Sequence, residues 1–93
     1  MTFKEITDLM VETYERKNHD YGNSFDKSVD EFGLVSPAIR LTDKLNRFKT
    51  LIHTGSTVKD ESICDTLLDL ANYSILTYLY ISNNERSQHT ENS

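Results

Sequence analysis

The chain has 93 residues, of which 37% are hydrophobic and 27% charged, and its formal net charge at pH 7 is −5. This length allows one domain with a limited core, and the composition excludes wholesale disorder. The negative charge argues against binding to extended nucleic acid, which needs many Lys and Arg contacts to phosphate, and no apolar run reaches the roughly 20 residues of a membrane span. The single cysteine, Cys64, excludes an internal disulfide, and the N-terminus lacks a signal-peptide pattern, so we expect a cytoplasmic protein.

Residues 2–16 are predicted to form the first helix. Thr2 followed by Glu5 is typical of a capping box, and apolar residues recur behind this pair at helical spacing. The next stretch, residues 17–24, is polar and rich in turn formers, so we expect a loop there.

A short helix is predicted over residues 24–32, with Gly33 as its stop. Its inward-facing residues should be Phe25, Val29 and Phe32. The third helix has clear boundaries, because Ser36 can cap it, Pro37 fits its first position and Gly55 lies just beyond its last turn. Its apolar stripe consists of Ala38, Leu41, Leu45, Phe48, Leu51 and Ile52.

The fourth predicted helix begins between residues 59 and 61 and extends to about Ser82. Much of it should be buried, through an apolar arc of Ile63, Cys64, Leu67, Leu68, Leu70, Ala71, Ile75 and Tyr78. Residues 83–93 contain no apolar side chain and are expected to form a disordered polar tail. The sequence therefore predicts one all-α domain over residues 1–82, a small bundle of about four helices. Because such a core is thin, we expect self-association into a homodimer or a higher oligomer.

Three carboxylates spaced four residues apart mark the fourth helix. Glu61, Asp65, Asp69 and Asn72 fall within an arc of roughly 80° on a helix, and like charges at this spacing repel each other. The repulsion can be offset by a divalent cation, by basic side chains of a neighbouring helix, or by exposure to water. Since Mg²⁺ prefers carboxylate oxygens, Glu61, Asp65 and Asp69 are candidate ligands for it.

The third helix carries the opposite charge along one edge of its apolar stripe. Arg40, Lys44 and Arg47 line this edge, and Asp43 lies beside them. If the edge faces the carboxylates of the fourth helix, one interpretation is a network of structural ion pairs. The other is a binding site, in which the basic side chains hold phosphate oxygens. The two interpretations are compatible.

The predicted loop is a third candidate element. Lys17, Asp20, Tyr21 and Ser24 offer a cation, an acceptor, a stacking ring and a hydroxyl group. These side chains either contact a ligand or belong to a solvated connection whose Tyr21 packs on the core.

Three segments of the chain resemble the nucleotide-modification-associated domain of phages and prophages. They read KNHDYGNSF at residues 17–25, RLTDKLNR at residues 40–47 and ESICDTLLDLANY at residues 61–73. The resemblance covers roughly residues 5–80 and implies a role in handling modified or free nucleotides, in the cytoplasm of an infected or lysogenic bacterial host. The positions that match are Lys17, Asp20, Tyr21, Arg40, Asp43, Lys44, Arg47, Glu61, Asp65, Asp69, Asn72 and Tyr73.

The chain is more distantly similar to the all-α nucleoside-triphosphate pyrophosphatases of the MazG and dimeric dUTPase kind. That resemblance implies acidic residues on two neighbouring helices that hold Mg²⁺. The third predicted helix offers only Asp43 where those enzymes have a pair of glutamates, which puts hydrolysis in doubt.

Three functions are therefore expected as alternatives. The first is a phage nucleotide-binding protein, in one version a Mg²⁺-dependent phosphohydrolase with Asp65 and Asp69 as catalytic residues and with Tyr21 or Tyr73 stacked on the base. The second is a non-catalytic sponge that sequesters a nucleotide second messenger of anti-phage immunity. The third is a structural interaction module whose charged stripes only hold helices together.

Overall fold

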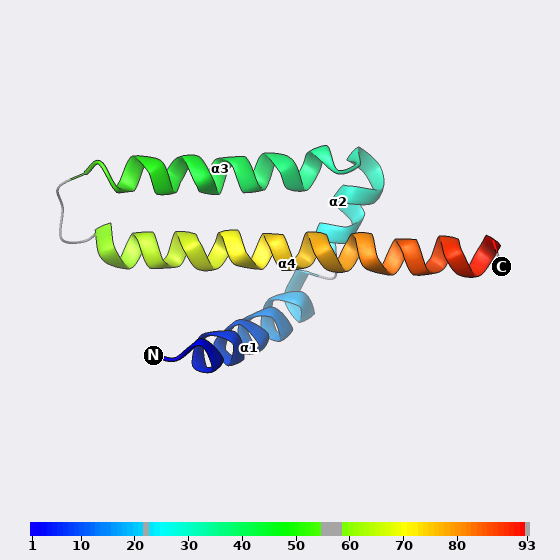
Figure 1. The fold of residues 1–93 in the computed structure, drawn as a ribbon, viewed down its shortest axis with the longest axis horizontal. Coiled ribbons are helices and arrows are strands. Elements are labelled where there is room, and N and C mark those ends of the chain that lie inside the picture. Colours follow the sequence, from blue (N-terminus) through cyan, green and yellow to red (C-terminus); the bar gives the residue numbers. More distant parts are fainter. Residues whose placement is uncertain (22, 55–58, 93) are drawn as a thin grey trace.

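Within the residues that it describes, a computed structural model places four helices: α1 (Phe3–Tyr21), α2 (Ser24–Phe32), α3 (Val35–Leu51) and α4 (Lys59–Asn92) (Figure 1). The backbone is described for residues 1–21, 23–54 and 59–92, and side chains for residues 1–17, 23–54 and 62–84. This part of the chain contains no strand, which confirms the predicted all-α class. No helix in it combines the length and the apolar character that a membrane span requires.

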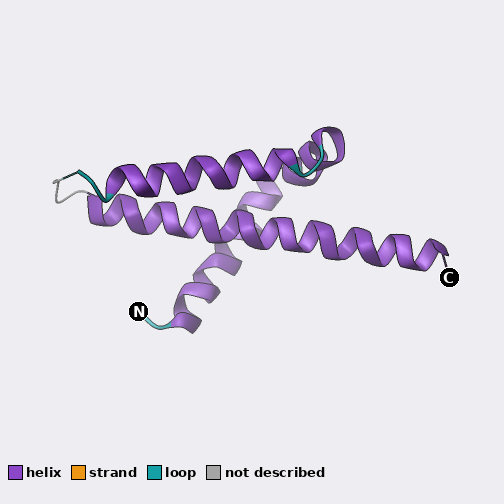
Figure 2. Cartoon of the chain, turned by 45° about the horizontal axis from the view of Figure 1, so that its top comes forward, coloured by secondary structure: helices purple, strands orange, loops and turns teal. Residues whose placement is uncertain are grey.

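The most extensive contact between helices joins α3 and α4, which run antiparallel and lie side by side as a hairpin (Figures 1 and 2). α2 packs at the beginning of α3. α1 lies on the other side of α4 from α3 and makes few contacts with the other helices. The core is correspondingly small: the buried residues of the described part are Val29, Pro37 and Thr66.

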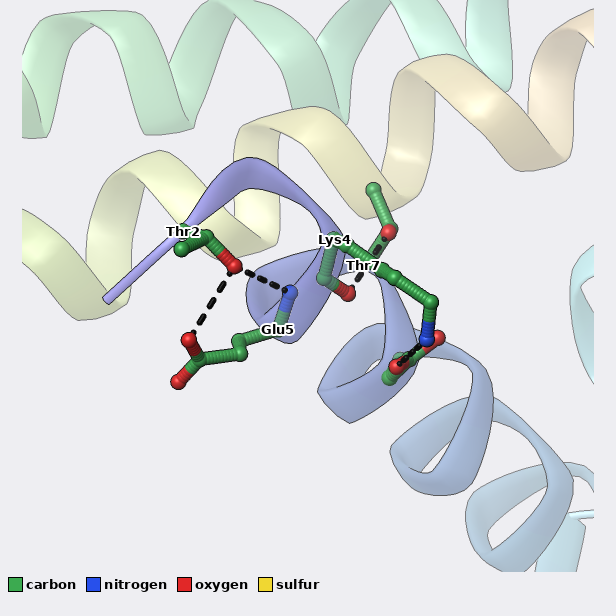
Figure 3. A network of polar contacts seen from close by, with 5 residues as sticks. Thr2, Lys4, Glu5 and Thr7 are labelled. Carbon is green, nitrogen blue, oxygen red and sulfur yellow. Dashed lines mark hydrogen bonds and ion pairs between the residues drawn. The ribbon is translucent and has the colours of Figure 1, made fainter.

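The start of α1 confirms the capping box. Thr2 Oγ1 accepts a hydrogen bond from the Glu5 backbone N–H (3.2 Å) and donates one to Glu5 Oε1 (3.1 Å), as Figure 3 shows. An ion pair between Lys4 and Asp8 (2.6 Å) follows one turn later. The end of α1 differs from the prediction, since the helix continues through Tyr21 where we expected a loop. Residues 18–20 have modest helix propensity, but none of them is glycine or proline, so nothing in them ends the helix.

The boundaries of α2 are as predicted. Gly33 ends it with a φ of 77°, a conformation that glycine adopts readily, and its N–H donates to the Val29 carbonyl oxygen (2.7 Å). Val29 is 3% exposed, as expected for a core residue. The inward orientation predicted for Phe32 is wrong, because this side chain is 63% exposed. It lies in the last turn of α2, beside the connection to α3, where no described helix covers it.

α3 begins one residue before the predicted cap. Leu34 precedes the helix, its carbonyl oxygen accepts the N–H of Ala38 (3.1 Å), and Ser36 lies inside the first turn. Pro37 is tolerated in this turn because the first N–H groups of a helix have no partner within it. Gly55, the predicted stop, lies outside the described residues, but the helix ends at Leu51, close to the predicted position.

α4 turns a different face to α3 than its apolar pattern indicates. Asp69 and Tyr73 contact α3, and Thr66 lies on the same face of α4. Thr66 is 2% exposed and its hydroxyl donates to the Ser62 carbonyl oxygen (2.7 Å). The predicted burial of the apolar arc is wrong for Cys64, Leu67, Ile75 and Tyr78, which are exposed. Because α4 is apolar around most of its circumference, periodicity does not select the face that packs on α3.

The other end of α4 also differs from the expected boundary. We expected the helix to stop at Ser82, where the apolar residues end, but it continues to Asn92. The loss of apolar residues marks the end of a buried face rather than of the helix, and no glycine or proline interrupts the sequence there.

A hydrogen bond joins α4 to α2. Tyr80 Oη donates to Asp30 Oδ1 at 2.5 Å. This bond to a carboxylate, with desolvation and the negative charge of Asp30 as further causes, raises the pKa of Tyr80 above its ordinary value of 10.0. A raised pKa means that the contact stabilises the fold fully below the ordinary pKa, and that this stabilisation is lost as the pH rises through the higher pKa of the folded state.

We expect Tyr80→Phe to lower the melting temperature at neutral pH, because Asp30 loses its donor. The variant should also lose less stability than the parent between about pH 9 and 11, since it has no phenol to ionise at this position. Thermal unfolding followed by circular dichroism measures both effects. Tyr14→Phe is the matched control, because the Tyr14 side chain is 39% exposed and lies on α1, away from Asp30. Equal melting temperatures for the two variants would contradict a role for the Tyr80–Asp30 bond.

Candidate functional site

A groove of about 450 Å³ is lined by the second half of α1, the start of α2, the middle of α4 and Arg40 of α3. The α4 side of the groove is formed by Asp69, Asn72, Tyr73 and Leu76. The last three follow Asp69 by three, four and seven residues, so all four side chains lie on one face of the helix.

The other helices complete the lining of the groove. α3 contributes Arg40, and α1 contributes Thr13, Tyr14 and Lys17 from successive turns. The segment that opens α2 contributes Asn23, Ser24, Phe25 and Asp26. Asn23 has a φ of 64°, in the left-handed region that asparagine tolerates better than most residues, and this turn brings the start of α2 to the groove.

Tyr73 is the central contact of the site. The guanidinium carbon of Arg40 lies 5.5 Å from the centroid of its ring, a cation–π contact between α3 and α4. Phe25 stacks beside the same ring, with centroids 6.3 Å apart and planes inclined by 26°. Tyr73 thus contacts both Arg40 of α3 and Phe25 of α2 at the groove.

An ion pair connects α3 and α4 at the edge of the groove. Lys44 Nζ lies 3.1 Å from Asp69 Oδ2, and both side chains are partly exposed. A pair of this kind contributes at most about 1 kcal/mol to stability, because water screens it. The pair matters more for the electrostatics of the groove, because the Lys44 ammonium compensates the negative charge of Asp69. The basic edge of α3 and the acidic stripe of α4 therefore meet through one ion pair, as the interpretation of structural ion pairs requires.

The groove is locally positive in an acidic chain. Lys17, Arg40 and Lys44 bring three positive charges to the groove or its edge, against the two carboxylates of Asp26 and Asp69. The whole chain has a net charge of −5. Three positive against two negative charges leave a local excess of one positive charge, which attracts an anion that the net charge of the whole chain repels.

The structure brings together only part of the predicted site. Six of the predicted residues line the groove: Lys17, Ser24, Arg40, Asp69, Asn72 and Tyr73. Lys44 reaches it through its ion pair. Three others are exposed and do not line it: Asp43, Arg47 and Asp65. The side chains of Asp20, Tyr21 and Glu61 lie outside the described residues.

Several groove residues were not among the predicted ones. Thr13 and Tyr14 belong to the apolar side of the first predicted helix, and their periodicity indicates packing rather than a site. Phe25 was expected only as a core residue. Asp26 carries no signal in the sequence, because its approach to the groove depends on the turn before α2.

The described side chains do not by themselves form a metal centre. Among them, no three His, Cys, Asp or Glu residues lie close enough together to hold an ion. Asp65 is exposed, and the ammonium group of Lys44 already lies beside Asp69. Since the Glu61 side chain is not described, Mg²⁺ binding by Glu61, Asp65 and Asp69 stays a prediction.

Comparison with known proteins gives one family match. A family described as nucleotide modification associated domain 1 matches residues 17–81. The chain belongs to this family. The match begins at Lys17, extends through α2 and α3 and ends within α4 at Ile81, so all groove residues except Thr13 and Tyr14 lie inside it. Searches of curated proteins and of solved structures give no match. The family description associates the domain with nucleotide modification and names no reaction.

Proposed function

We propose that the groove binds a nucleotide and that this binding does not require Mg²⁺. The observation that carries the proposal is the lining of the groove, which combines aromatic rings with the local excess of positive charge. A nucleotide has both matching parts, a flat base and an anionic phosphate. The groove volume of about 450 Å³ also falls within the range of roughly 300–1,000 Å³ that small-molecule sites occupy.

The phosphate is assigned to the cations of the groove. Arg40 provides a planar guanidinium with several donors, suited to two phosphate oxygens at once, and its contact with Tyr73 orients it before a ligand arrives. Lys17 approaches from α1 and adds a second charge. Lys44 lies one ion pair away, so it compensates Asp69 and keeps that carboxylate from repelling the phosphate.

The base is assigned to the aromatic side chains. Tyr14, Phe25 and Tyr73 line the groove from three different helices. Tyr73 already contacts Arg40 and Phe25, so the ring of Tyr14 and the face of Phe25 turned away from Tyr73 are the better stacking surfaces. Asn23 and Asn72 supply amide donors and acceptors for the edge of the base.

Binding without hydrolysis is the form of the function that the groove supports best. Asp69 is compensated by Lys44, so the site reaches a favourable charge balance without a cation. The sponge predicted from the sequence needs binding alone, whereas a phosphohydrolase needs the carboxylate trio as a metal site.

A thermal-shift screen of nucleoside mono-, di- and triphosphates and cyclic dinucleotides, each with and without Mg²⁺, tests the proposal. At a concentration 100 times its Kd, a bound nucleotide stabilises the fold by about 2.7 kcal/mol, which raises the melting temperature by roughly ten degrees or more. We expect the same shift in both metal conditions, and chromatography should recover the nucleotide intact.

Asp69→Asn distinguishes this proposal from the metal-dependent alternative. Removing a negative charge and releasing Lys44 should preserve or strengthen nucleotide binding, whereas a metal site would lose it. Glu31→Gln is the charge control, because Glu31 is exposed, does not line the groove and belongs to none of the predicted sites. A shift that appears only with Mg²⁺ and disappears in Asp69→Asn contradicts metal-independent binding. No shift with any nucleotide favours the structural module.

A further inference from the structure

The side of α4 that points away from α3 is apolar and mostly exposed. We call it the outer face of α4; it consists of Cys64, Leu67, Leu68, Ala71, Ile75, Tyr78 and Leu79, of which Leu68 and Ala71 are half-buried and the others exposed. At 100° per residue these side chains occupy about a third of the circumference, and none is charged. Ile75 is 48% and Tyr78 is 72% exposed. The buried Thr66 lies on the opposite side of the helix.

The chain exposes more surface than a folded monomer of its mass. Its accessible surface is 7299 Å², whereas a compact monomer of 10.8 kDa exposes about 5,500 Å². Its radius of gyration is 15.7 Å, against about 12–13 Å for a compact domain of this length. The surplus of roughly 1,800 Å² lies within the range that one subunit of an obligate homodimer buries.

We propose that a second copy of the chain packs antiparallel on the outer face of α4, with the two-fold axis at Ala71. A two-fold pair requires the face to be complementary to itself, residue by residue. Around position 71 the sequence satisfies this requirement: Leu67 lies opposite Ile75 of the partner, and Cys64 lies opposite Tyr78 of the partner. Ala71, the smallest side chain of the face, lies where the two helices cross and need to approach most closely.

This pairing yields a core of four helices, the α3/α4 hairpin of each copy. It leaves the groove accessible, because Asp69 and Tyr73 lie on the α3 side of α4. The other possible occupant of the outer face is α1 of the same chain, which lies on that side of α4 and makes few contacts with the other helices. Closure of α1 would produce a compact monomer, so the oligomeric state separates the two arrangements.

The test combines sedimentation with a cross-link. The parent chain should sediment as a dimer at micromolar concentration. Tyr78→Cys should form an intermolecular disulfide with Cys64 of the partner under mild oxidation, seen on a non-reducing gel. The parent should not cross-link, because two Cys64 residues in an antiparallel pair are about 21 Å apart along the axis.

Asn83→Cys is the matched control, since this position is exposed on α4 but lies away from the outer face; it should not cross-link to Cys64. Ile75→Glu should shift the chain towards monomer, and circular dichroism shows whether that variant still folds. A monomer in the parent, a Cys64–Cys64 cross-link in the parent, or equal cross-linking by the Tyr78→Cys and Asn83→Cys variants would each overturn the antiparallel pairing.

Discussion

Arg40→Gln should weaken nucleotide binding by roughly 10- to 150-fold. This range corresponds to the loss of hydrogen bonds to a charged group, about 1.5–3 kcal/mol. Arg40 is the groove cation held in place before binding, through its contact with Tyr73, so glutamine removes both the charge and the oriented donors. Isothermal titration with the nucleotide that gives the largest thermal shift measures the change.

Arg47→Gln is the control that makes this prediction specific. Arg47 lies on the same helix and has the same charge, and both side chains are exposed, but Arg47 does not line the groove. We expect the Kd of Arg47→Gln to stay within about two-fold of the parent, since salt screens a charge that does not contact the ligand. If both variants lose affinity equally, the phosphate is attracted by overall charge, and the assigned role of Arg40 is wrong.

Val29→Asp should largely unfold the protein. Val29 is 3% exposed in the small core beneath α2, so aspartate there places an unpaired carboxylate away from water, at a cost of at least about 3 kcal/mol. A chain this short has little stability to lose, because natural domains are stable by only about 5–15 kcal/mol. Circular dichroism and urea unfolding measure the effect.

Phe32→Asp makes the same chemical change three residues further along α2. Because Phe32 is 63% exposed, this variant should fold and keep most of its stability. The pattern of the sequence places both residues on the core side, whereas the structure separates them. Unfolding of both variants, or of neither, would contradict the position of α2 in the fold.

The local features of the fold were predictable because single residues determine them. Gly33 ends α2 through its positive φ, and the Thr2–Glu5 pair starts α1. The meeting of α3 and α4 was predictable for a similar reason, since two charged stripes of opposite sign on neighbouring helices favour contact, and Lys44 does pair with Asp69.

The incorrect predictions concern features of the fold that no single residue determines. α1 continues through residues that are permissive for both helix and loop, so its end was not determined by composition. The orientation of α4 depends on tertiary contacts, because the helix is apolar on several sides. The groove was only half predicted for the same reason: Tyr14 and Asp26 reach it through the placement of α1 and α2, which no spacing within the sequence encodes.

The most direct test of the central claim is an NMR titration of the isotope-labelled protein with the nucleotide selected by the thermal-shift screen, in the absence of Mg²⁺. We predict saturable changes in the amide signals of Ser24, Phe25, Asn72 and Tyr73, from the two sides of the groove, with unchanged signals for residues 49–54 at the far end of α3. Changes confined to residues outside the groove, or no change at saturating nucleotide, would contradict the assignment of the groove as the binding site.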